Sequence, residues 1–154
     1  MNRSVINRFS NLLKIALEKT KGSLIITPSR RTGKENIRTL CENLSDLPVY
    51  IWNGIETNPY YGILALSDAL VVTCDSINMI SEACATGKPV HVVHLDGGNR
   101  KFREFHDNMQ TAGYTRTFEG RLEHWNYKLP DDTTNIAKRV HELLNTNVCR
   151  TTST

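Results

Sequence analysis

Several features that would place this 154-residue sequence in a specialised class are missing from it. There is no run of about 18 apolar residues, so no membrane-spanning helix is predicted. The first residues lack the apolar core of a signal peptide. The four cysteines form no C-x-x-C pair and match no zinc-ligand spacing, so we expect free thiols, no metal site and a reducing compartment. These absences predict a cytoplasmic protein.

The net charge is also small: its formal value is only +3, and the sequence pI is about 8.7. A mild excess of this size suits a small anionic ligand and does not call for nucleic acid, so we expect no nucleic-acid partner. The length suits one domain. We predict a single nucleotide-binding domain over residues 1–145 and a frayed polar tail over 146–154.

Helical periodicity alternates along the chain with short apolar runs that are typical of buried parallel strands. This alternation predicts an α/β fold: a Rossmann-like three-layer parallel sheet with helices on both faces. The stretch 114–129 is predicted to be irregular. The predicted helices cover 4–20, 34–45, 60–67, 76–86, 99–112 and a last segment from Asp131 or Asp132, and the predicted strands cover 24–27, 48–52, 69–73 and 89–93.

Ligands of such sheets bind beyond the carboxyl ends of the strands, so the loops there carry the candidate site. The loop after the first predicted strand contains Ser29, Arg30, Arg31 and Thr32, just before a helix begins. Guanidinium groups and the N–H groups of a helix N-terminus both suit phosphate oxygens. The alternative is a solvated basic turn.

The loop after the third predicted strand contains Asp75 and Ser76 and opens the next helix. Either side chain could cap that helix, and the same N-terminus could hold a diphosphate. Glu82 lies about two turns further on, where a carboxylate could accept ribose hydroxyls or could simply be solvated. His94 follows the fourth predicted strand, so it also lies at the ligand edge together with the loop Asp96-Gly97-Gly98.

Three motifs occur in order: Ser29 to Thr32, Asn58-Pro59-Tyr60, and Asp75 to Ala83, the last followed by Gly87-Lys88-Pro89. In this combination the sequence resembles the mitochondrial-fission protein family and its bacterial homologues. The strand, serine turn, Ser-Glu helix and Gly-x-Pro exit also resemble the C-terminal, donor-binding half of GT-B glycosyltransferases. The resemblance covers most of residues 1–130.

The resemblance implies that Glu82 meets ribose and that Ser76 and its neighbours, Asp75 and Met79 among them, meet a diphosphate. It adds Asn58 and Tyr60 to the ligand edge. The chain departs from the GT-B pattern because it begins at the helix after the usual first strand and glycine-rich loop. We therefore expect a fragment without that strand and without the N-terminal domain, and we expect it to be inactive alone. No residue is predicted to be catalytic.

Two functions remain open at this point. The first is binding of a nucleoside diphosphate sugar for glycosyl transfer, completed by the N-terminal GT-B domain or by contact with a second copy. The second is a non-catalytic interaction module that recruits a dynamin-related GTPase, as the resemblance implies, with peripheral membrane association of the full-length protein. A generic dinucleotide domain is disfavoured because no G-x-G-x-x-G follows any predicted strand. Neither a cofactor nor a metal ion is predicted.

Overall fold

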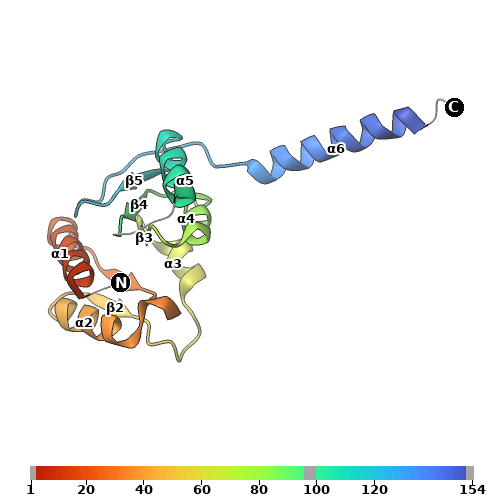
Figure 1. Ribbon diagram of the computed structural model, residues 1–154. Helices are drawn as coiled ribbons and strands as arrows, with labels where there is room; N and C mark the ends of the chain where they lie inside the picture. The colour runs from red at the N-terminus through yellow and green to blue at the C-terminus, as the bar shows by residue number, and fades with distance from the viewer. Residues whose placement is uncertain (1–2, 96–99, 152–154) are drawn as a thin grey trace.

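The computed structural model describes residues 3–95 and 100–151, and for Arg30, Asp132 and residues 146–151 it describes the backbone only. Helices and parallel strands alternate along it, so the predicted Rossmann-like α/β class is confirmed (Figure 1). The helices are α1 (Arg3–Thr20), the 3-10 turn η1 (Arg30–Thr32), α2 (Lys34–Leu44), α3 (Tyr60–Leu66), α4 (Ile77–Cys84), α5 (Arg100–Thr111) and α6 (Asp132–Thr151). The strands are β1 (Leu24–Ile26), β2 (Val49–Ile51), β3 (Leu70–Thr73), β4 (Val90–Val93) and β5 (Thr115–Thr117).

The strands form two small parallel sheets in place of the one continuous sheet expected. One sheet pairs β1 with β2, with Ile25 opposite Tyr50, and the other has the order β3-β4-β5, with Val71 opposite His91. The strand β5 lies inside the stretch predicted to be irregular, so that part of the prediction is wrong. Its sequence is Thr-Arg-Thr, which has no apolar run to reveal a strand.

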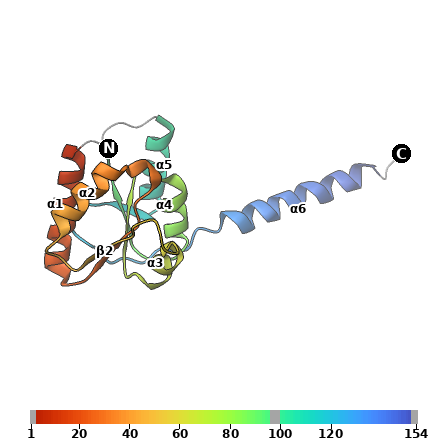
Figure 2. The ribbon, with the colours of Figure 1, turned by 90° about the horizontal axis from the view of Figure 1, so that it is seen from below.

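Alternation of side chains along β3 and β4 gives the larger sheet a helical layer on each face. Leu70 and Val72 face a core cluster that contains Ile80 of α4, with Phe105 of α5 packed against it. Val71 and Val93 point the other way, toward the cluster formed by α1 and α2. In the second view α1 and α2 stand on one side of the strands, and α4 and α5 stand on the other (Figure 2).

The smaller sheet is covered on one side only. Residues Leu24 and Ile26 of β1 pack toward the cluster of α1 and α2, which contains Leu13 and Leu40. Ile25 and its partner Tyr50 on β2 point away from that cluster and are 48% and 46% exposed. The expected helices on both faces are therefore present at β3 and β4 but not at this face.

Two helices contribute little to the core. Every residue of α3 is exposed or half-buried. The helix α6 projects away from the rest of the chain (Figure 1). Its apolar residues are exposed to between 49% and 64%: Ile136, Val140, Leu143 and Leu144. No helix within the described residues is long and apolar enough to span a membrane.

Candidate functional site

The loops after β1 and β3 meet at the carboxyl edge of the strands, as the topology predicts. The Arg31 guanidinium donates a hydrogen bond to the Asp75 backbone carbonyl at 3.5 Å, and the same nitrogen lies 3.8 Å from an Asp75 carboxylate oxygen. Both side chains are substantially exposed, at 69% and 41%, so the pair adds little to stability. Its interest is positional, because it places a guanidinium beside the N-terminus of α4.

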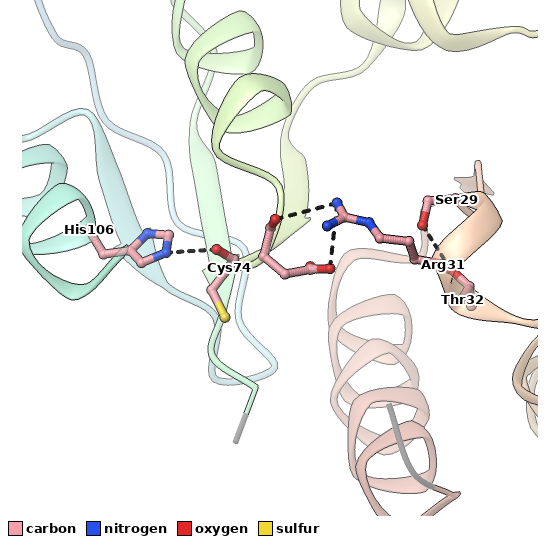
Figure 3. Close-up of polar contacts among 6 residues, drawn as sticks. Ser29, Arg31, Thr32, Cys74 and His106 are labelled. Carbon is pink, nitrogen blue, oxygen red and sulfur yellow. Dashed lines mark hydrogen bonds and ion pairs between the residues drawn. The ribbon is translucent and has the colours of Figure 1, made fainter. Parts of the chain in front are cut away.

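The first loop is shaped by a 3-10 turn followed by a glycine. The Thr32 N–H donates to the Ser29 carbonyl at 3.0 Å, and the two side-chain hydroxyls lie 3.4 Å apart (Figure 3). Gly33 then begins α2 with φ at +79°, a backbone conformation in which any side chain is strained. The side chain of Arg30 lies outside the described residues, so its predicted role stays a prediction.

The second loop is held from behind by a histidine that the sequence did not single out. His106 on α5 is buried, and its Nε2 donates to the Cys74 carbonyl at 2.8 Å (Figure 3). The Cys74 sulfur accepts the Leu95 N–H at 3.2 Å, and the Cys74 N–H donates to the Val93 carbonyl at 3.0 Å. Three contacts therefore fix the residue immediately before Asp75.

The helix α4 opens without the side-chain cap that the sequence suggested. Ser76 is the N-cap residue, but its hydroxyl makes no capping hydrogen bond, and the Asp75 side chain does not replace it. One Asp75 carboxylate oxygen is buried without a hydrogen-bond partner within the described part of the chain. The N–H groups of the first turn thus keep the capacity to bind an anion.

Glu82 lies on the exposed face of α4, while Ile80, Ala83 and Cys84 face the core. It is about 9 Å along the helix axis from the N-cap residue Ser76, at about 1.5 Å per residue. Helical side chains lean toward the helix N-terminus, which directs Glu82 toward the ligand edge.

Tyr60 brings the second sequence motif to Glu82. Its hydroxyl donates a hydrogen bond to Glu82 Oε2 across 22 residues of sequence. The side-chain oxygen of Asn58 accepts the Tyr60 N–H at 3.0 Å and so starts α3. Partial burial, followed by the hydrogen bond to Glu82 and its charge, raises the pKa of Tyr60, so this phenol stays protonated at neutral pH.

Two other predicted residues have different surroundings. Met79 is half-buried and packs against the cluster that contains Ile80. His94 lines a small, open depression between α1 and the end of β4, and its ring centroid lies 5.6 Å from that of His106. Burial, with the nearby His106 second, lowers the pKa of His94. The loop 96–99, which includes Asp96, lies outside the described residues.

The part of the chain that the structure describes has no cluster of three or more histidine, cysteine or carboxylate side chains arranged to hold a metal ion. Cys41, Cys74 and Cys84 are free thiols.

Lys88, in the Gly-Lys-Pro motif, has a role that the sequence did not reveal. Its ammonium donates to the Leu64 carbonyl at 2.8 Å and to the Ala65 carbonyl at 2.6 Å. These are orphan carbonyls at the end of a helix, which a cation satisfies well. Lys88 therefore holds the C-terminal end of α3 in place, while the hydrogen bond from Tyr60 to Glu82 holds its start against α4.

Fold and site together define an α/β protein of Rossmann-like type with hydroxyl, guanidinium and carboxylate groups gathered at the carboxyl edge of its strands. A family model described as mitochondrial fission ELM1 matches residues 1–144. The chain belongs to this mitochondrial fission ELM1 family.

Two relatives support the assignment. The chain is 46% identical over 129 residues to the mitochondrial fission protein ELM1 of Arabidopsis thaliana, an alignment that covers 81% of this chain and 30% of the relative. It is 28% identical over 151 residues to the uncharacterized protein RP120 of Rickettsia prowazekii (strain Madrid E), which covers 93% of this chain and 41% of the relative. The chain thus spans less than half the length of these two relatives. No solved structure matches it.

Proposed function

We propose that this chain binds a nucleoside diphosphate, carried in its biological ligand by a sugar, at the carboxyl edge of its strands. The observation that supports this most strongly is the meeting of all three sequence motifs around α4. Arg31 reaches Asp75 at the start of that helix, and Tyr60 reaches Glu82 two turns along it. A guanidinium at the start of α4 and a carboxylate further along the same helix suit a ligand that carries phosphate at one end and hydroxyl groups at the other.

The proposed roles follow from the chemistry of each group. Arg31, Ser29, Thr32 and the N–H groups at the start of α4 bind the diphosphate, because a guanidinium fork and a helix N-terminus both favour phosphate oxygens. Glu82 accepts hydrogen bonds from ribose. Glycosyl transfer, as in the GT-B enzymes that the sequence resembles, is the reaction that such a donor site would serve.

Titration calorimetry with UDP tests this proposal. Glu82→Ala is expected to weaken UDP binding by roughly 1.5–3 kcal/mol, the contribution of charge-assisted hydrogen bonds, without altering the fold. Glu18→Ala on the exposed face of α1 is the matched control and should leave affinity unchanged. Equal affinities for wild type and the Glu82 variant would remove the ribose role, and wild type that binds neither UDP nor ADP nor GDP would refute nucleotide binding.

A second candidate function is a protein-interaction module that recruits a dynamin-related GTPase. The exposed apolar residues favour this candidate: Ile55 in the loop before α3 and Leu66 at the end of α3 are 86% and 85% exposed, and α6 carries a further apolar stripe. Exposed apolar surface of this kind is typical of protein contacts. Binding of a dynamin-related GTPase that is lost on Leu66→Glu but kept on Glu82→Ala would support this function over the first.

A further inference from the structure

The hydrogen bond between Tyr60 and Glu82 occupies part of the carboxylate that is proposed to meet ribose. Tyr60 donates to Oε2 of Glu82. A carboxylate has two oxygens and about four acceptor sites, so Oε1 and part of Oε2 remain able to accept other hydrogen bonds. The Glu82 side chain is exposed, so a ligand can reach these sites.

The Tyr60 oxygen is itself an acceptor once its proton points to Glu82. A phenolic hydroxyl both donates and accepts, and here the donor is already in use. The pair therefore presents two adjacent acceptors, Glu82 Oε1 and Tyr60 Oη. A ribose ring offers the complementary pattern, two neighbouring hydroxyl donors.

We propose that Tyr60 and Glu82 together bind the two hydroxyl groups of ribose, one of which donates to Glu82 and the other to Tyr60. Tyr60 is then a specificity-determining residue. This inference rests on the proposed nucleotide binding. It predicts that a ligand lacking either hydroxyl loses one of the two contacts.

Tyr60 is held in place by contacts that do not involve Glu82. Asn58 accepts its N–H, and the Ile63 N–H donates to the Pro59 carbonyl at 2.9 Å in the first turn of α3. Lys88 fastens the other end of the helix. Ile63 and Leu64 of α3 also pack against the core cluster that contains Ile80. Removing only the Tyr60 hydroxyl breaks the contact with Glu82 but keeps these attachments, so it should leave α3 in position.

The test is calorimetry of UDP, 2′-deoxy-UDP, 3′-deoxy-UDP and pyrophosphate against wild type and Tyr60→Phe. Wild type should prefer UDP to each deoxy ligand: by about three- to tenfold where the lost contact is the neutral hydrogen bond to Tyr60, and by roughly tenfold or more where it is the hydrogen bond to the Glu82 carboxylate. Tyr60→Phe should lose the preference over one deoxy ligand, keep it over the other and bind pyrophosphate as wild type does. Glu82→Gln should reduce the preference over both.

Three controls make the result decisive. Thermal denaturation checks that each variant is folded, and Tyr61→Phe, at a neighbouring tyrosine that is 78% exposed, should behave as wild type. Hydrogen exchange at the amides of α3 is the third control: if Tyr60→Phe opens this helix, the lost preference comes from the helix and the inference is wrong.

The inference also fails if Tyr60→Phe keeps both preferences or weakens all four ligands equally. These outcomes leave nucleotide binding itself intact. Wild type that binds none of the uridine ligands would instead overturn the proposed function and this inference with it.

Discussion

Replacing Lys88 by methionine should free the C-terminal end of α3 from the rest of the domain. The ammonium of Lys88 donates to two carbonyls in the last turn of that helix, at 2.8 and 2.6 Å. Methionine keeps most of the aliphatic stem, so the change removes the charge and its hydrogen bonds and preserves the packing. The helix α3 has no fully buried residue, so these bonds add to the packing of half-buried Ile63 and Leu64 against the core in holding it.

A hydrogen bond to a charged group contributes about 1.5–3 kcal/mol when it is well shielded. Lys88 is half-buried and the freed carbonyls gain water, so we expect a loss of about 1–3 kcal/mol for the two bonds together. Urea denaturation measures the global change, and hydrogen exchange at the amides of α3 measures local opening. Lys19→Met, at an exposed position on α1, is the control. A loss below about 0.5 kcal/mol with unchanged exchange in α3 would refute the reasoning, since that is the range of neutral surface substitutions.

Three further predictions concern other parts of the chain. Arg31→Lys should weaken UDP binding by about 0.5–1.5 kcal/mol while sparing uridine, because a point charge cannot reproduce a planar fork; Arg121→Lys should have no effect, and an equal loss for both ligands would indicate misfolding. Burial lowers the pKa of His91; the Glu123 carboxylate raises it and Arg116 lowers it further. The unfolded chain therefore binds more protons than the folded one, and the free energy of unfolding should fall as the pH drops below about 6.5. In urea titrations at several pH values this fall should be shallower for His91→Asn, and parallel curves for the two proteins would argue against the idea. The apolar stripe of α6 should make the chain self-associate, so light scattering should show oligomers that Val140→Glu disperses, whereas a monomeric wild type at high concentration would contradict the idea.

Local sequence patterns were enough to locate most helices and strands. The apolar run within 69–73 and the 3.6-residue periodicity of α1 each identify one element without any knowledge of its neighbours. The pairing of strands into sheets is harder to predict, because an apolar run does not indicate which other strand it will pair with. The division into two sheets was therefore not predicted, and β5 was missed because its short sequence is polar.

The candidate site shows the same limit. The loops that carry Arg31 and Asp75 could be found, since parallel strands bring their carboxyl ends to one edge. The residues that contact the site from other elements could not be predicted, because those contacts depend on the three-dimensional arrangement of segments far apart in the sequence. Glu82 accepts a hydrogen bond from a tyrosine 22 residues away, and Cys74, in the loop before α4, accepts one from His106 on α5, 32 residues away. A buried histidine on an amphipathic helix carries no local signal of that contact.

The two sides of the candidate site differ in how firmly they are attached to the core. On one side, Cys74 is fixed by the β-sheet, by the Leu95 N–H and by a buried histidine, so the loop that opens α4 rests directly on the core. On the other side, Tyr60 belongs to a helix with no fully buried residue, which packs half-buried Ile63 and Leu64 against the core and is held at its two ends by polar groups. Segments with few buried contacts open most easily, and a ligand that binds only the closed form stabilises it. If a nucleotide contacts both Glu82 and Tyr60, its binding energy is therefore shared with the ordering of α3. The affinity of the site should then depend on Lys88, which contacts no proposed ligand group but determines how often α3 is in place.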